Sequence, residues 1–376
     1  METNTSFTEG KILKPLILFA FPVLLALFLQ AMYGAVDLLI VGKFASSADV
    51  SAVSTGSQIM TTLTNLISSF AMGTTILLGQ QIGSGKKEEG GRTVGTAIVM
   101  FAAIAVVMSI IMVVFAPSIS QIMNAPEEAF QKTIDYIRIC GGGMLVIVAY
   151  NLIGCIFRGL GDSKTPLITV AIACVFNIAG DLILCAGFHM GTQGAAIATV
   201  FAQIVSVVVS FFLICKKELP FTVKNKNIRI HKVYLKKMVG FGAPIALQDL
   251  LVSISFLIIL AIVNSMGVIA SAGVGVAEKC VCIYHAHIVC FHAVHVGICG
   301  TKLWRRSDYK SQKSLALRHC RFFFHWRGNV FSITFFHGDA LAGIFSRMGK
   351  WFFAAADYLK AYAIDCLFTA ISSAIP

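Results

Sequence analysis

Four polar residues lie inside apolar stretches of the sequence, where an uncompensated charge is costly. Asp37 lies deep in the first stretch, and Asn177 and Asp181 are spaced i and i+4 in the fifth, so they project from one face of a helix. Thr199 adds a hydroxyl group in the next stretch. Their oxygens suit a hard cation such as Na⁺ or a shared proton, although a buried acid can also serve packing alone. We expect these residues to form a cation- or proton-binding site.

The elements that position these residues are predicted to be membrane-spanning helices. The chain of 376 residues is 57% hydrophobic and 13% charged, with a mean hydropathy of +0.82. Soluble domains are roughly 45–50% apolar and about 25% charged, so this composition excludes a typical soluble fold. The net charge of +12 is spread among short loops, which argues against a nucleic-acid partner.

Lys and Arg gather in the loops at 86–92, 158–164 and 216–237, whereas the loops at 116–128 and 187–194 carry none. By the positive-inside rule, the basic loops and the N-terminus face the cytoplasm. We therefore predict a multi-pass protein of the plasma membrane. Its first seven helices are predicted at residues 15–41, 51–79, 92–116, 134–157, 165–187, 192–215 and 238–264.

The polar segment 216–237 is predicted to divide the chain into two lobes. Residues 1–215 form an N-lobe of helices 1–6, residues 216–237 a basic cytoplasmic linker, and residues 238–376 a partial C-lobe with helices 7 to about 10. Pro22 in the first helix has a counterpart in Pro244, so the two lobes repeat with an offset of 222 positions. An even number of spans between the copies predicts parallel lobes with substrate sites between them.

Residues 280–331 differ in character from the preceding chain, because they are rich in His, Cys, Trp and Arg. One interpretation is a metal site around His285 and His287, although the spacing fits no compact zinc pattern well. Read one base later with suitable codons, the segment instead yields an apolar helix followed by AQNYGAG. That motif parallels Gly79–Gly85 at nearly the offset of the two prolines. We therefore predict that residues 280–331 are out of frame.

Several motifs, taken in their order and spacing, resemble the multidrug and toxic compound extrusion (MATE) family. The resemblance covers about residues 1–279 and resumes patchily at 332–346 and 354–370. The motifs are Pro22 with Asp37, Val41 and Gly42, then GQQIGSGK at 79–86, RGLGDSKTPL at 158–167, Asn177 with Asp181, and GAAIATVFAQ at 194–203.

The resemblance implies an all-α integral membrane fold, a MATE-like two-lobe bundle whose N-lobe of six transmembrane helices is complete and whose C-lobe is incomplete. It implies an antiporter, coupled to Na⁺ or H⁺, that exports amphipathic cationic drugs or toxic compounds by alternating access. Asp37, Asn177, Asp181 and Thr199 match the family's coupling site, with no metal beyond Na⁺ and no cofactor, and Pro22 matches the bending point of helix 1. The implied partners are small-molecule drugs and the lipid bilayer, for a monomer that is not an enzyme.

Other functions remain open at this point. A flippase for lipid-linked saccharides can share this helical plan but requires a cationic cavity, whereas the predicted sites are acidic. A non-functional fragment would result if the altered C-lobe left the bundle unclosed. An intramembrane enzyme or metal-handling protein would need converging His, Cys or carboxylate groups in a stable core. Asp249 and Asp365 are not part of the predicted site, because Asp249 lies off the position where some MATE members carry an acidic residue in helix 7.

Overall fold

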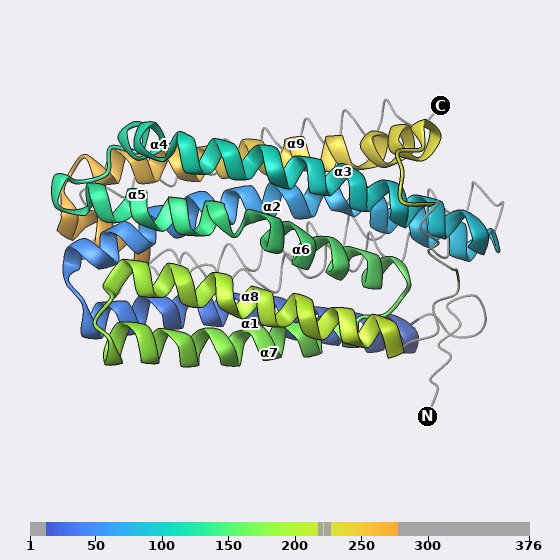
Figure 1. Cartoon of the computed structure of the whole chain (residues 1–376), viewed down its shortest axis with the longest axis horizontal. Helices are drawn as coiled ribbons and strands as arrows, with labels where there is room; N and C mark the ends of the chain where they lie inside the picture. The colour runs from blue at the N-terminus through green and yellow to red at the C-terminus, as the bar shows by residue number, and fades with distance from the viewer. Residues whose placement is uncertain (1–12, 217–220, 222–226, 277–376) are drawn as a thin grey trace. The chain divides into compact units, whose positions relative to one another are not determined.

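The computed structural model describes residues 13–216, 221 and 227–276, and these residues are almost entirely helical (Figure 1). The prediction of an all-α fold is confirmed. The helices are α1 (Leu13–Phe44), α2 (Ser47–Gly83), α3 (Lys87–Val114), α4 (Ala116–Ile122), α5 (Glu127–Gly142), α6 (Met144–Gly159), α7 (Lys164–Asp181), the π-helix η1 (Leu182–Gly187), α8 (Gly191–Lys216) and α9 (Lys232–Asn264). A further helical stretch runs over residues 268–276.

Some predictions fall on residues that the structure does not describe. These are the out-of-frame segment 280–331, the alternative metal site around His285, and helices 8 to 10 of the C-lobe. Most of the predicted linker 216–237 also lies outside the described residues.

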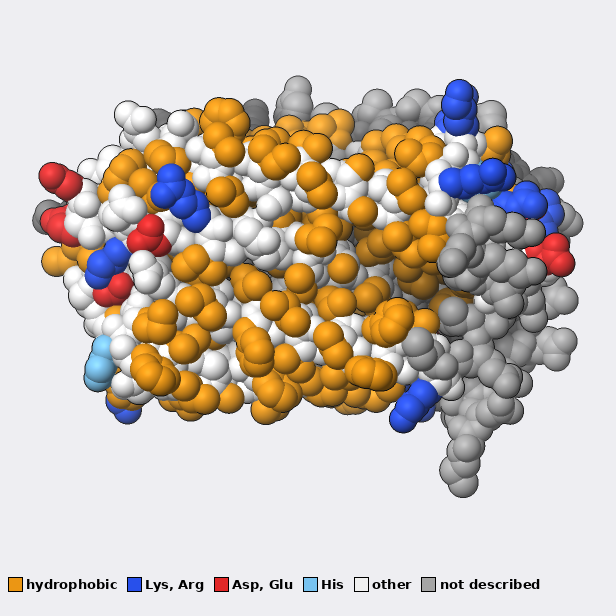
Figure 2. All heavy atoms as spheres, in the orientation of Figure 1, with side chains coloured by type: hydrophobic (Ala, Val, Ile, Leu, Met, Phe, Trp, Pro, Cys, Tyr) orange, Lys and Arg blue, Asp and Glu red, His pale blue; other side chains and the backbone are white. Residues whose placement is uncertain are grey.

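Six of the described helices are long and apolar enough to cross a membrane, and the pair α5 and α6 adds a seventh if it counts as one span. These seven correspond to the seven predicted stretches. On the face seen in Figure 2, hydrophobic side chains cover the middle of the described helices, and most of the charged side chains lie near the two ends. This distribution is the one expected of helices that meet lipid in the middle and water at their ends.

The predicted fourth helix, 134–157, is wrong as a single straight element. The structure has two helices, α5 and α6, that bend by 55° at a break around Gly143. A Cβ atom at Gly143 would lie 2.7 Å from a methyl carbon of Val200 on α8. The close approach of α8, together with the run of three glycines at 141–143, accounts for the bend, because glycine weakens a helix and admits a neighbouring element.

The helix α2 lies at the centre of the described bundle. It packs against α5 and α6 on one side and against α9 on the other, while α1 packs along α7 and α7 along α8. The crossing of α2 and α9 depends on small residues: a Cβ atom at Gly73 would collide with the backbone oxygen of Met238, and one at Gly242 with that of Phe70. Glycines at such crossings let helix backbones approach closely within a membrane.

Candidate functional site

The predicted acidic residues Asp37 and Asp181 meet inside the bundle. Asp37 comes from α1 and is 5% exposed, and Asp181, the last residue of α7, is 0% exposed. The two carboxyl groups interact directly. The chain continues past Asp181 as the π-helix η1, a helix type that is frequently found at functional sites. Two acids from helices far apart in sequence therefore share one buried position.

The other two predicted residues extend this acidic pair along α7 and α8. Asn177 lies one helical turn before Asp181, and its side-chain amide donates a hydrogen bond of 3.4 Å to the Thr199 hydroxyl. Asn177 is 1% exposed and its Oδ1 accepts no hydrogen bond from the described residues. No described donor reaches either side-chain oxygen of Asp181. The structure thus brings all four predicted residues together and leaves buried oxygens that a cation or a proton could satisfy.

Three residues that the sequence prediction omitted also border this site. Tyr33, one turn before Asp37 on α1, interacts with the side chain of Gln203 on α8. Tyr136 on α5 is buried and lies within electrostatic range of both Asp37 and Asp181. The i and i+4 spacing of Tyr33 and Asp37 was a usable signal in the sequence. The approach of Tyr136 depends on tertiary packing, and no local pattern indicates it.

A small cavity adjoins the site. Its volume is about 10 Å³, which is room for about one water molecule. It is lined by Tyr33, Tyr150, Ala173, Asn177, Thr199, Ala202 and Gln203. Since amide, hydroxyl and phenol groups surround it, the cavity suits water or a dehydrated monovalent cation better than an organic molecule.

Pro22 lies within α1 and is buried. It removes one backbone hydrogen bond from the helix, which makes this position a weak point. At 1.5 Å per residue, Pro22 lies roughly 22 Å from Asp37 along α1. Pro244 likewise lies inside α9, so the two prolines that indicate the predicted repeat both lie within long continuous helices.

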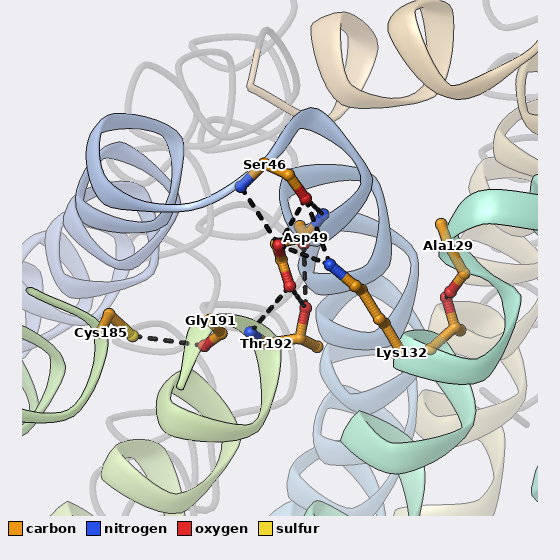
Figure 3. Close-up of polar contacts among 8 residues, drawn as sticks. Ser46, Asp49, Ala129, Lys132, Cys185, Gly191 and Thr192 are labelled. Atoms are coloured by element: carbon orange, nitrogen blue, oxygen red, sulfur yellow. Dashed lines mark hydrogen bonds and ion pairs between the residues drawn. The ribbon is translucent and has the colours of Figure 1, made fainter. Parts of the chain in front are cut away.

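A second polar cluster lies at the ends of α2, α5 and α8 and centres on Asp49 (Figure 3). The Asp49 carboxylate pairs with Lys132 Nζ at 2.7 Å and accepts a hydrogen bond of 2.9 Å from the Thr192 hydroxyl. It also accepts a bond of 2.5 Å from the hydroxyl of Ser46, the N-cap residue of α2. Every charge in this cluster is compensated, so the cluster joins three helix ends and offers no unsatisfied group for a ligand.

The comparisons with known proteins agree with these features. Residues 22–183 match the family model MatE. The probable multidrug resistance protein YpnP of Bacillus subtilis (strain 168) is 27% identical over 274 residues, which cover 73% of this chain and 61% of YpnP. The probable multidrug resistance protein YoeA of the same organism is 29% identical over 280 residues, covering 72% of this chain and 60% of YoeA. The matched part thus spans about three fifths of these relatives.

Solved structures match the fold. One is the inward-facing conformation of a multidrug resistance MATE family transporter of the MOP superfamily. It matches with a TM-score of 0.65 and 22% sequence identity, and the match covers 70% of this chain and 60% of the transporter chain. Another is a MOP superfamily transporter from Pyrococcus furiosus, described as having a binding pocket of reverse polarity, with a TM-score of 0.78, 19% identity, and coverage of 97% and 79%. At these identities the likeness supports the fold alone. This likeness in fold agrees with the match of residues 22–183 of this multi-pass membrane protein to the family model MatE and with its similarity to the two relatives, both named as probable multidrug resistance proteins.

Proposed function

We propose that the protein exports amphipathic cationic drugs or toxic compounds across the plasma membrane by antiport with Na⁺ or H⁺. The observation that carries this proposal is the buried pair Asp37 and Asp181. Two carboxylates in one buried position repel each other unless a cation or a proton lies between them. Uptake of one positive charge at the pair is therefore the expected coupling event.

The surrounding oxygens favour a monovalent ion over a larger ligand. Asn177 Oδ1 and the Asp181 oxygens accept no hydrogen bond from the described residues, and the adjoining cavity is about 10 Å³ in volume. Na⁺ binding would use these oxygens as ligands, whereas a proton would be shared by the two carboxyl groups alone. The two ions therefore predict different effects of changing Asn177, which loses a ligand in the first case only.

Alternating access follows from the proposed position of the charge. Neutralisation of the pair would change how α1 packs against α7, and Pro22 provides the weak point at which α1 can bend. In this proposal the N-terminus is cytoplasmic, and the protein acts as a monomer. The names of the relatives YpnP and YoeA, which describe probable multidrug resistance proteins, support drugs as the cargo.

The acidic site also bears on the alternatives. A flippase for lipid-linked saccharides would have to attract a negatively charged phosphate linkage, and the buried carboxyl pair would repel it. A fragment without activity would still bind the coupling ion if residues 13–216 retain their fold. Ion binding and transport are therefore tested separately.

The transport test is ethidium efflux from cells that lack their own exporters. The chain is expected to lower the ethidium that the cells retain, and Asp37→Asn is expected to reduce the efflux rate at least tenfold. Glu128→Gln, which changes an exposed acid at the start of α5, serves as the matched control and should keep the rate. Equal efflux from the unchanged chain and Asp37→Asn would refute the coupling role.

The binding test uses the purified chain. Infrared difference spectra on adding Na⁺ or changing pH report whether a carboxyl group loses or gains a proton. A signal that disappears in both Asp37→Asn and Asp181→Asn assigns the event to the pair. If Asn177→Ala abolishes the spectral change on adding Na⁺ but keeps the change on lowering the pH, then Na⁺ binding uses the Asn177 oxygen as a ligand in addition to the carboxyl pair.

A further inference from the structure

A cavity of about 250 Å³ lies at the end of the bundle where α1 ends and where α2 and α8 begin. The described residues that line it come from these helix ends, from the first turns of α5 and from residues 189–193. The basic loops at 86–92 and 158–164 lie at the opposite end, after α2 and before α7. The cavity is larger than the one of about 10 Å³ beside the acidic pair and has room for several water molecules.

The residues that line this outer cavity carry an excess of negative charge when the His189 imidazole is neutral. They include two carboxylates, Asp49 and Asp135, and one lysine, which pairs with Asp49. Asp135 accepts hydrogen bonds of 3.0 Å from the side-chain amides of Gln131 and Gln193, and both donors are neutral. A hollow lined by net negative charge raises the local concentration of cations. The outer cavity therefore favours a small cation over an anion.

Three of the elements that line the outer cavity also reach the acidic pair. On α1, Asp37 lies about two turns before Phe44, a distance of roughly 10 Å along the helix. On α5, Asp135 lines the cavity, and the next residue, Tyr136, lies within electrostatic range of both acids. The π-helix η1 begins directly after Asp181 and ends close to the lining residues 189–193. The cavity and the pair are therefore neighbours along the same three elements.

Cys185 of η1 lies between the outer cavity and the acidic pair. Its thiol donates a hydrogen bond of 3.3 Å to the carbonyl of Gly191, which lines the cavity (Figure 3). Cys185 is 0% exposed and lies within electrostatic range of Asp37 and Asp181 as well as of Asp49 in the cavity wall. A thiol is a small side chain that forms only weak hydrogen bonds, so its displacement costs little.

We propose that the coupling cation, Na⁺ or H⁺, reaches Asp37 and Asp181 through the outer cavity and past Cys185. This inference rests on the proposed antiport and adds the route by which the ion enters. In the proposed orientation the cavity faces the outside of the cell, because it lies opposite the basic loops. An exporter driven by antiport takes up its ion on the side where it releases its cargo, since the ion moves inward down its gradient.

The alternative is entry through the cavity of about 10 Å³ beside Tyr33 and Gln203. Two substitutions on the proposed route separate the two paths. Gln193→Trp fills the outer cavity from an exposed position in its wall, and Cys185→Ala removes the thiol between the cavity and the pair. A residue on a route changes the rates of ion uptake and release together and leaves the equilibrium affinity unchanged. A residue that only supports the fold has no such signature.

The test is proton uptake by the purified full-length chain in phosphatidylcholine nanodiscs, followed with the dye pyranine after stopped-flow mixing to lower pH. The part of the uptake that Asp37→Asn removes reports the pair. Gln193→Trp is expected to slow this part at least tenfold, and Cys185→Ala to accelerate it at least threefold, with the proton affinity within twofold in both. The matched control is Gln121→Trp, at an exposed position of α4 outside the cavity, and its rate should stay within twofold.

Three results would overturn the proposed route. They are uptake by Gln193→Trp within twofold of the unchanged chain, equal slowing in Gln193→Trp and Gln121→Trp, and a loss of proton affinity in Gln193→Trp that accounts for its change in rate. Uptake by the unchanged chain that does not depend on Asp37 would instead remove the coupling site itself, and the route with it. The test needs no transport, so failure of the route and failure of the coupling site are distinguishable.

Discussion

Replacing Asp49 by Ala should destabilise the helix bundle more than any other single change in its polar cluster. The substitution removes the ion pair with Lys132, the bonds from the Ser46 hydroxyl and backbone at 2.5 and 3.1 Å, and the bonds from the Thr192 hydroxyl and backbone at 2.9 and 3.3 Å. Lys132 is 40% exposed, so its pair contributes only about 0.5–1 kcal/mol. Thr192 is 2% exposed, and leaving its donors unsatisfied costs about 1–3 kcal/mol.

The lost reciprocal cap at the start of α2 adds about 1 kcal/mol, so Asp49→Ala is expected to cost about 3–4 kcal/mol. Asp49→Asn keeps an acceptor and loses the charge, which should cost about 1–2 kcal/mol. Lys132→Met is the matched control, because it breaks the same ion pair but leaves the bonds from Ser46 and Thr192, and should cost less than about 1 kcal/mol.

The assay is the apparent melting temperature in one detergent at fixed pH and salt, read from the aggregation of the purified chain. The expected order of stability is unchanged chain, Lys132→Met, Asp49→Asn and Asp49→Ala, with several degrees between the first and the last. If Asp49→Ala melts no lower than Lys132→Met, the buried hydrogen bonds do not hold the three helix ends together, and the reasoning is wrong.

Two further predictions concern the contact between α2 and α9, each with a neighbouring control in the same melting assay. Gly242→Ala should destabilise the chain by about 1–3 kcal/mol, because the added methyl group meets the Phe70 carbonyl. In the control Gly240→Ala, the added methyl group has nothing within 4 Å, so this variant should be neutral or slightly stabilising. Equal effects of the two substitutions would refute the close crossing of α2 and α9. Asn264→Ala should cost about 2–3 kcal/mol of stability, because the Asn264 side chain is 1% exposed and forms hydrogen bonds with Thr55, Ser271 and the Met123 carbonyl. The control Ser265→Ala changes an exposed side chain and should cost less than about 0.5 kcal/mol. A loss of stability in Ser265→Ala as large as that in Asn264→Ala would contradict this prediction.

The long helices could be predicted because hydropathy over about 20 residues depends little on tertiary contacts. Their ends could not be placed as well. The second helix was predicted at 51–79 and runs over Ser47–Gly83, because Ser46 and Asp49 form a capping box that extends it at the start. The spacing Ser-x-x-Asp is visible in the sequence, so the start of α2 could have been predicted from this local pattern.

The bend at Gly143 has a different cause. Three consecutive glycines permit a break, but glycine also lines straight contacts between membrane helices, as Gly73 and Gly242 do. The approach of Val200 on α8 selects the bend, and this approach is a tertiary event. A one-dimensional pattern could therefore predict a weak point and could not predict the 55° angle.

The candidate site also has one part that local sequence spacing predicts and one part that depends on tertiary packing. The i and i+4 spacing placed Asn177 and Asp181 on one face of a helix, and helical geometry alone guarantees that result. The meeting of Asp37 with Asp181 depends on the packing of α1 along α7. The residue types suggested one cation or proton site, and the family resemblance implied the same site, but no local pattern could show that the two acids come close to each other. Gln203 lies four residues after Thr199 on α8, so its spacing was a usable signal, whereas the approach of Tyr136 depends on the packing of α5 and no local pattern indicates it.

The charge of the partner, rather than the residue type, separates the roles that we assign to these aspartates. Asp49 faces a lysine, whereas Asp37 faces another acid. The same change of Asp to Asn should therefore lower stability at Asp49 and ion coupling at Asp37. A substitution at Asp49 that abolished ethidium binding without lowering the melting temperature would break this rule, because a fully compensated carboxylate has no charge left to offer a ligand.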